Sequence, residues 1–170
     1  MGRSLKGRAL QLLAQREHSR AELRRKLLAH ARADEASSAD ADATPPADPT
    51  TQVNAVLDWL EAHNYLSQER FVESRVHARA ARFGNLRIRR ELAQHAVSLS
   101  PEAAQSLQAS ELERARAVWS RKYPTPPADA VARARQARFL AGRGFSPEVI
   151  RRVLRAAGPA PEAEFTEQGD

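Results

Sequence analysis

The amino-acid sequence predicts an all-α protein made of tandem three-helix repeats, with about nine helices. Three observations predict this fold class. Alanine and arginine, both strong helix formers, supply 33 and 24 of the 170 residues, whereas Val, Ile and Thr together supply only 16. No segment alternates apolar and polar residues as a half-buried β-strand would. The third observation is an internal repeat.

A five-residue pattern, aliphatic-Arg-Arg-x-Leu, occurs three times along the chain. It is found at residues 23–27 (LRRKL), 88–92 (IRREL) and 150–154 (IRRVL). In a helix the aliphatic first and last positions face one side, and the two arginines face the other. Because one such unit is too small to bury its apolar stripe alone, the repetition predicts three stacked three-helix units.

The first unit is expected at residues 1–64. Apolar residues at helical spacing indicate a helix over residues 5–13. Ser19 begins a second helix as its N-cap, and Glu22, three positions later, completes a capping box. A third helix is expected from about residue 52 to 63, where four aliphatic residues share one stripe.

The second unit is expected at residues 65–108. Ser67 is the expected N-cap of a fourth helix, and Gly84 and Asn85 end that helix and begin a fifth. The fifth helix should turn its aliphatic residues and Ala96 inward. Ser100, followed by a proline, begins a short sixth helix.

The third unit is expected at residues 109–157. A seventh helix carries Leu112, Ala115 and Trp119 at helical spacing, and three prolines between residues 123 and 129 separate it from an eighth. Ser146 and its following proline begin a ninth helix, which contains the last copy of the arginine pattern. Most of these helices are short, so the apolar residues must be buried between neighbours.

Acidic residues are concentrated in two segments. Residues 31–50 hold five acidic residues and one basic residue but no large apolar side chain, so burial cannot offset the entropy of ordering them, and a disordered insertion is predicted. A flexible acidic tail is predicted at residues 158–170, with four acidic residues and no basic one. The rest of the chain carries 26 basic and 12 acidic residues, which favours a polyanion or an acidic protein groove as partner.

The motifs of common enzyme classes are absent from the sequence. Without cysteine there is no disulfide, thiolate zinc site or cysteine nucleophile. There is no G-x-x-x-x-G-K-[ST] phosphate loop and no G-x-S-x-G elbow, and the five histidines lack H-x-x-x-H spacing. We therefore expect no catalytic residue, no metal and no cofactor. No uninterrupted apolar run indicates a signal peptide or a membrane span, so a cytoplasmic protein without membrane contact is expected.

The candidate binding residues are arginines of the repeated pattern and of two neighbouring helix faces. A charged, solvated surface explains any one copy, but repetition at three matched positions favours a binding surface. Guanidinium groups suit this role because their planar forks match carboxylate and phosphate. The candidates are Arg24, Arg25, Arg75, Arg79, Arg82, Arg89, Arg90, Arg151, Arg152 and Arg155.

Four segments in order resemble the RecX family of regulatory proteins. They are ALQLLAQREHSRAELRRKLL, VLDWLEAHNYLSQERFVESRV, FGNLRIRRELA and RFLAGRGFSPEVIRRVL, and the resemblance covers nearly all of residues 9–155. It implies tandem three-helix units in an elongated, curved molecule. It also implies binding in the groove of the RecA filament, with repression of RecA's recombinase, ATPase and coprotease activities and hence regulation of DNA repair and the SOS response. No catalytic residue is implied.

The segment at residues 31–50 departs from the family, whose members usually join the second and third helices by a short loop. Two other functions stay open from composition alone. One is a free-standing basic module that binds single-stranded DNA through phosphate contacts, and the other is a helical adaptor for an unrelated acidic partner. In each case a monomer is expected.

Overall fold

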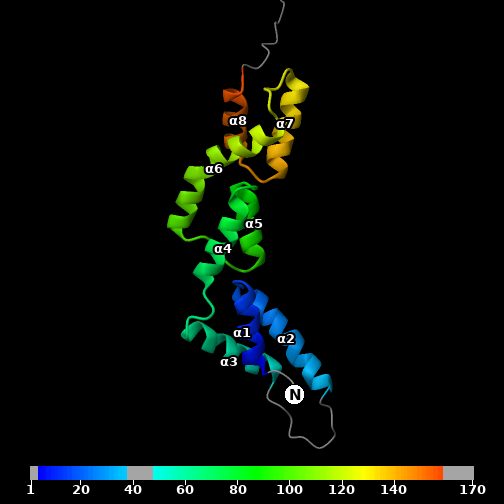
Figure 1. The fold of residues 1–170 in the computed structure, drawn as a ribbon, viewed down its shortest axis with the longest axis vertical. Coiled ribbons are helices and arrows are strands. Elements are labelled where there is room, and N and C mark those ends of the chain that lie inside the picture. Colours follow the sequence, from blue (N-terminus) through cyan, green and yellow to red (C-terminus); the bar gives the residue numbers. More distant parts are fainter. Residues whose placement is uncertain (1–3, 38–47, 159–170) are drawn as a thin grey trace, which may run out of the picture. The chain divides into compact units, whose positions relative to one another are not determined.

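The computed structural model describes residues 4–37 and 48–158, which form eight α-helices and no strand (Figure 1). The all-α prediction is therefore confirmed. The chain divides into two compact units. One comprises the described residues up to Arg75 together with Leu92–Ser98, and the other comprises Val76–Glu91 and the described residues from Leu99 onward.

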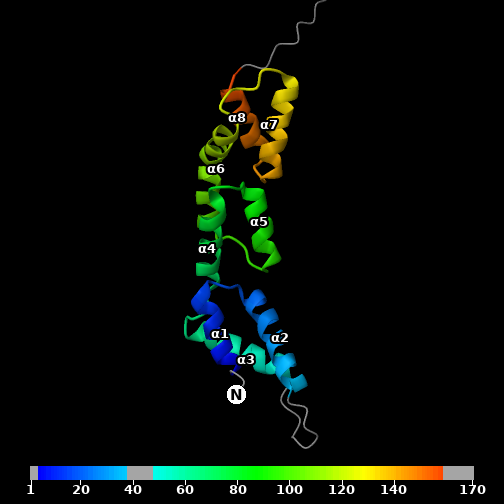
Figure 2. The ribbon, with the colours of Figure 1, turned by 45° about the vertical axis from the view of Figure 1, so that its right-hand side comes forward.

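The first unit is built around α1 (Leu5–Gln15), α2 (Arg20–Ser37) and α3 (Pro49–Ala62), which pack on one another (Figure 2). Each helix contributes the apolar stripe that its spacing predicts. The buried residues are Ala9, Leu12, Leu23, Leu27, Ala31, Val53, Leu57, Leu60 and Leu66. This cluster fixes the face that each helix turns away from the core.

Helix α2 is longer than the sequence predicts. It continues to Ser37, and Ala31 is buried in the core, so the expected disordered insertion at residues 31–50 is wrong over its first seven residues. At the other end, the Asp48 side chain accepts a hydrogen bond from the Thr51 amide and caps α3. Alanine-rich sequence extends a helix that packing has already nucleated. Residues 38–47 lie outside the described residues.

The helices α4 (Gln68–Ala80) and α5 (Asn85–Gln94) each have residues in both units. Ser67 caps α4 as predicted, because its Oγ accepts from the Arg70 amide at 3.2 Å. The prediction for Ala96 is wrong. The residue lies beyond the end of α5 with φ at +56°, and its side chain is exposed.

The second unit contains α6 (Pro101–Lys122), α7 (Ala130–Gly142) and α8 (Pro147–Ala156). The predicted sixth and seventh helices are one helix, α6, because no glycine or internal proline interrupts residues 102–122. The described part of the chain therefore has eight helices where about nine were expected. The core consists of Ala115, Val118, Leu140, Phe145, Val149, Ile150, Val153 and Leu154.

Two backbone segments of this unit touch where α5 and α8 begin. The Gly84 amide donates to the Arg143 carbonyl at 2.9 Å, and the Leu86 amide donates to the Gly144 carbonyl at 3.0 Å. A Cβ atom at Gly84 would lie 2.3 Å from the Gly144 oxygen and from the Phe145 backbone. Only glycine permits this approach, and Arg89 and Arg90 belong to the same unit as the third copy of the arginine pattern.

The buried carboxylate of Glu111, on α6, joins the beginnings of α5 and α8. Its Oε1 accepts from the backbone amides of Asn85 at 2.9 Å and Ser146 at 3.3 Å, and its Oε2 accepts from the Ser146 hydroxyl at 3.3 Å. Amides at a helix N-terminus lack intrahelical acceptors, and a negative charge there is favourable. One side chain thus fixes the starting points of two helices.

Arg114, one turn further along α6, binds backbone at the end of α4. It donates to the carbonyls of Ala80 at 3.1 Å and Phe83 at 2.8 Å, and to Oδ1 of Asn85. Burial lowers the pKa of Arg114 from its usual value, and the nearby charge of Glu111 opposes that change. The side chain therefore serves the fold and does not belong to the exposed arginines.

No helix in residues 4–37 and 48–158 is long and apolar enough to cross a membrane. Within these same residues, no group of three or more potential metal-binding side chains occurs.

Candidate basic binding surface

The aliphatic positions of the repeated pattern are buried in all three copies. The exposed fraction is 0% for Leu23 and Ile88 and 7% for Ile150, and the leucine that ends each copy is also buried. Because these residues point into a core, the arginines between them are turned toward the surface. The prediction that the aliphatic positions are buried is confirmed.

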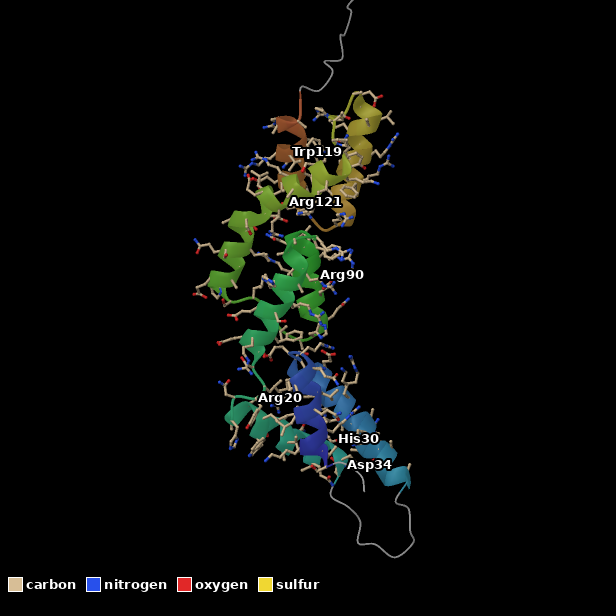
Figure 3. All side chains as sticks on the ribbon, viewed as in Figure 1. Arg20, His30, Asp34, Arg90, Trp119 and Arg121 are labelled. Carbon is tan, nitrogen blue, oxygen red and sulfur yellow. The ribbon has the colours of Figure 1, made fainter. Side chains whose placement is uncertain are left out.

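The arginines of the second and third copies lie fully at the surface. Arg89 and Arg90 on α5, and Arg151 and Arg152 on α8, are exposed, and within the described residues their side chains form no hydrogen bond or ion pair. Figure 3 shows Arg90 projecting from α5. Arg155, one turn beyond Arg151, is exposed in the same way. These five residues are available to a ligand.

The two arginines of the first copy differ from each other. Arg25 is exposed, but Arg24 is half-buried and donates from Nε to Oδ1 of Asn54 at 3.1 Å. This bond ties α2 to α3. Arg20 makes a similar connection, since it reaches from α2 to Asp58 and Glu61 on α3 at 2.6 and 2.5 Å. Of the pair Arg24 and Arg25, Arg24 therefore has a structural role.

The three candidates near α4 are partly engaged within the protein. Arg75 donates to Nε2 of His95 at 3.3 Å. Arg79 forms an ion pair with Glu91 at 2.9 Å, on the helix that follows. Arg82 is exposed, and its guanidinium lies 5.8 Å from the ring centre of Phe83. Of this predicted stripe, Arg79 is paired with a carboxylate within the described residues, whereas Arg75 and Arg82 are not.

A basic depression of about 280 Å³ in the second unit was missed by the sequence analysis. Four cationic side chains line it together with Ala81, Val118 and Phe139, and no carboxylate from the described part of the chain does. Those cationic residues are Arg82, Arg121, Lys122 and Arg143. Their chain positions span 61 residues, so only the fold brings them together; the adjacent basic pair in the last turn of α6 was the one available signal.

Arg143 is held in place at the edge of this depression. Its guanidinium lies 4.7 Å from the ring centre of Phe139, and one nitrogen donates to the Arg82 carbonyl at 3.4 Å. Its Nε is buried and has no hydrogen-bond partner among the described residues. A fixed cation with unused donors is suited to an anionic oxygen.

The first unit also contains a buried charge cluster that the sequence analysis missed. Ser19 caps α2 as predicted, with its Oγ 3.1 Å from the Glu22 amide, but the Glu22 carboxylate binds Arg16 and lies 3.3 Å from Nζ of Lys26. Burial alone would raise the pKa of Glu22, but the hydrogen bond and charge of Arg16 and the hydrogen bond from Lys26 outweigh it and lower the pKa to about 2. The cluster anchors the start of α2.

His18 lies within this cluster and is 1% exposed. Its Nδ1 is 2.9 Å from the Arg16 carbonyl, and its Nε2 is 3.0 Å from Nζ of Lys26. A carbonyl only accepts and an ammonium only donates, so the histidine is neutral with its proton on Nδ1. Burial lowers the pKa of His18, which agrees with the neutral form.

Comparisons with known proteins identify a matching family model and several relatives of this chain. The family model described as "RecX, third three-helix domain" matches residues 109–154. Curated relatives, each named "Regulatory protein RecX", match most of the chain. The protein of Ralstonia nicotianae is 48% identical over 156 residues, which is 91% of this chain and 88% of the relative. That of Leptothrix cholodnii is 50% identical, covering 91% and 89%.

A third relative, from Ralstonia pickettii, is 43% identical over 169 residues and covers 98% of this chain and 93% of its own length. All three are similar over most of their length, so the likeness is not confined to residues 109–154, which the family model matches. With its buried aliphatic anchors and all-helical fold, the chain belongs to the RecX family of regulatory proteins.

Proposed function

We propose that this protein binds the RecA–DNA filament and represses RecA's recombinase, ATPase and coprotease activities, without being an enzyme itself. In this role it regulates DNA repair and the SOS response in the cytoplasm. The observation that carries the proposal is the set of exposed arginines at matching positions of the repeated pattern, in a chain of this family. Buried aliphatic residues hold these positions, so the surface is available before any partner binds.

The proposal includes three structural units at residues 1–64, 65–108 and 109–157, which present the arginines in turn. The match of the family's third three-helix domain to residues 109–154 supports the last of them. Arg25, Arg89, Arg90, Arg151 and Arg152 are the proposed contacts of the pattern. Each can bind a carboxylate of the filament or a DNA phosphate through two parallel hydrogen bonds.

The test is a titration of RecA's DNA-dependent ATPase with Arg89→Glu/Arg90→Glu. Both side chains are exposed and unpaired within the described residues, so the helical circular dichroism signal should stay nearly unchanged while repression is sharply reduced. Wild-type protein that leaves the ATPase and coprotease rates untouched at stoichiometric ratios would overturn the proposal.

A control with the same net charge change is Arg116→Glu/Arg138→Glu. Arg116 already pairs with Glu113 at 2.6 Å, and Arg138 contacts the Ala134 carbonyl at 3.4 Å on its own helix. This variant should keep most of the repression. Equal losses in the two variants would mean that total charge matters, and not the position of the arginines.

A second function, direct binding of single-stranded DNA, is supported by the basic depression. Arg82, Arg121, Lys122 and Arg143 offer four cationic groups around one hollow, with Phe139 at its wall. Phosphate contacts of this type give affinity without sequence preference. Binding to a labelled oligonucleotide in the absence of RecA separates this function from filament binding.

A further inference from the structure

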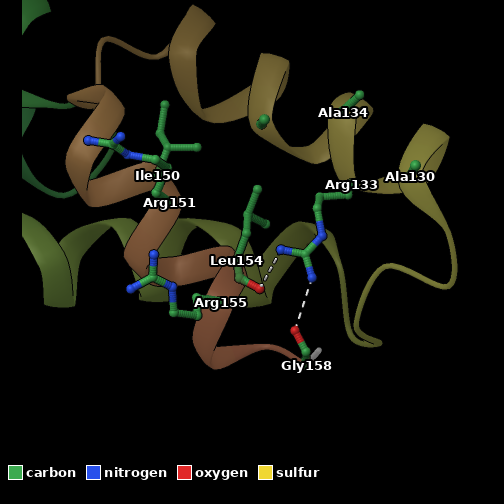
Figure 4. A pocket seen from close by; sticks show the side chains of 9 residues that line it. Ala130, Arg133, Ala134, Ile150, Arg151, Leu154, Arg155 and Gly158 are labelled. Carbon is green, nitrogen blue, oxygen red and sulfur yellow. Dashed lines mark hydrogen bonds between the residues drawn. The ribbon is translucent and has the colours of Figure 1, made fainter. Parts of the chain in front are cut away.

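The second unit has an open groove of about 620 Å³ between α7 and α8 (Figure 4). Helix α8 lines it with Ile150 and Leu154, and α7 lines it with three alanines at helical spacing, which are Ala130, Ala134 and Ala137. Because an alanine side chain is a single methyl group, these positions leave space above the helix. The groove therefore has an apolar floor with room for an apolar side chain from another molecule.

Positive charge borders this apolar floor. Arg151 and Arg155 line the groove from α8; both are exposed, and within the described residues their side chains form no hydrogen bond or ion pair. Arg133 lines it from α7 and is held in place, because its guanidinium donates to the carbonyls of Leu154 at 3.2 Å and Gly158 at 2.9 Å (Figure 4). No carboxylate from the described part of the chain lines the groove.

The helical spacing of α8 sets the pattern that a ligand must match. Ile150 and Leu154 form an apolar row, four residues apart, and Arg151 and Arg155 form a basic row beside it. Four residues of helix rise about 6 Å, so the two arginines leave the backbone about 6 Å apart. Two carboxylates four residues apart on one face of another helix have the same spacing.

We propose that the α7–α8 groove binds an acidic amphipathic helix of the partner protein. Aliphatic side chains of that helix contact the alanine floor, and its carboxylates pair with Arg151 and Arg155. In this mode of recognition the apolar side chains anchor the helix, and the complementary charges beside them fix its register. The inference rests on the proposed function, and it assigns the third copy of the arginine pattern to carboxylates of RecA and not to DNA phosphates.

The apolar floor favours a protein ligand over a nucleic acid. A phosphodiester strand would pair with the arginines but leave the floor without an apolar partner, whereas an amphipathic helix matches both. The basic depression of the same unit has the opposite character, with four cationic side chains around a volume of about 280 Å³. The second unit thus offers one site suited to phosphate and another suited to an acidic protein segment.

The first test changes the floor of the groove and leaves its charge unaltered. In Ala130→Gln/Ala134→Gln both positions are exposed, and glutamine is a good helix former whose longer, polar side chain covers the floor. The matched control is Ser106→Gln/Ala109→Gln, at exposed positions of α6 that line neither the groove nor the basic depression. In a titration of RecA's DNA-dependent ATPase, repression should be several-fold weaker for the groove variant and unchanged for the control.

The second test separates a protein ligand from DNA. Arg151→Gln/Arg155→Gln should also weaken repression several-fold, because it removes both ion pairs with the partner helix. Without RecA, its affinity for a labelled single-stranded oligonucleotide should fall no further than that of Arg116→Gln/Arg138→Gln, which loses the same net charge. A larger fall in the groove variant would overturn the proposal, because it would assign these arginines to DNA phosphates.

Failure of this inference and failure of the proposed function give different results. If the wild-type protein represses RecA and Ala130→Gln/Ala134→Gln represses it equally well, the inference alone is overturned. If the wild-type protein does not repress RecA, the proposed function is overturned, and this inference with it. Circular dichroism of each variant verifies that the helices are intact, so a loss of repression is assigned to the groove.

Discussion

At the scale of single residues, two buried carboxylates, Glu22 and Glu111, explain more of this structure than any exposed charge. Each is almost fully shielded from water, with an exposed fraction of 6% and 0% respectively. Glu22 is balanced by cations at the start of α2, and Glu111 is balanced by backbone amides at the starts of α5 and α8. A buried charge is tolerated only with such partners, so both residues should be sensitive to substitution.

Glu111→Ala should lower the free energy of unfolding by roughly 3 kcal/mol or more. The change removes the acceptor of the buried Asn85 amide and of the half-buried Ser146 amide, and it removes the charge that faces Arg114. Urea titration followed by circular dichroism measures the loss. The matched control is Glu113→Ala on the same helix. Its side chain is 72% exposed, and its loss should cost about 1 kcal/mol or less. Similar losses in both variants would contradict the role given to Glu111.

Acid should weaken the cluster at Glu22 over a defined pH window. The pKa of this carboxyl is about 2 in the folded protein against an ordinary value of 4.5. A depressed pKa contributes stability above pH 4.5, and that contribution is lost as the pH falls toward 2. The Glu22→Gln variant lacks this stabilising contribution at every pH. The difference in stability between wild type and variant should therefore shrink as the pH falls from 4.5 to 2. Chemical unfolding at several pH values measures this difference. A difference that stays constant with pH would contradict the prediction.

At the scale of elements, the helices are defined by their caps, and the loops before α5 and α8 are defined by contact with each other. Ser100, Asp129 and Ser146 each accept a bond from the amide three residues later, which is visible in the sequence as a cap residue. By contrast, no residue pattern in the sequence indicates that Gly84 pairs with the segment at Gly144. It depends on two loops 60 residues apart meeting in space.

Gly84→Ala should destabilise the second unit by about 1 to 3 kcal/mol, because the new Cβ would overlap backbone atoms that cannot move aside. Gly142→Ala is the matched control. A Cβ there meets nothing within 4 Å, and alanine favours the helix by up to about 1 kcal/mol. The midpoint of thermal unfolding should therefore fall for Gly84→Ala, and it should rise or stay unchanged for Gly142→Ala. Equal midpoints would show that the loops can separate without cost.

At the scale of the whole molecule, the property with the widest consequence is charge. The chain has a formal net charge of +6, and its acidic residues are concentrated in two segments, so the helical body is more basic than the total suggests. Such a surface attracts polyanions over distances of about 10 Å at moderate salt. Any direct binding to single-stranded DNA should therefore depend steeply on salt.

Removing cations from the basic depression should reduce that salt dependence. For single strands the log–log slope of affinity against salt is about −0.7 for each phosphate contacted. Arg121→Gln/Lys122→Gln should make the slope shallower by about 1.4 units if both side chains contact phosphates. Fluorescence anisotropy of a labelled oligonucleotide measures it. Arg116→Gln, whose guanidinium already pairs with Glu113, should leave the slope unchanged; an identical change in this control would assign the effect to net charge.

The sequence by itself determined the fold class, the cap residues and the buried positions of the repeated pattern. These follow from local rules, because helix propensity, capping and 3.6-residue periodicity act within one or two turns. The same rules placed Arg89, Arg90, Arg151 and Arg152 at the surface, where the structure has them. Their role in binding remains a prediction.

Only the tertiary structure decided which arginines keep an unpaired charge and which groups meet. Arg24 and Arg79 have partners on other helices, and Arg143 joins Arg82 across 61 positions of sequence. The continuation of α2 to Ser37 likewise depends on a core into which Ala31 packs. These outcomes are set by contacts between distant segments, and no periodicity along the chain records which segments will meet.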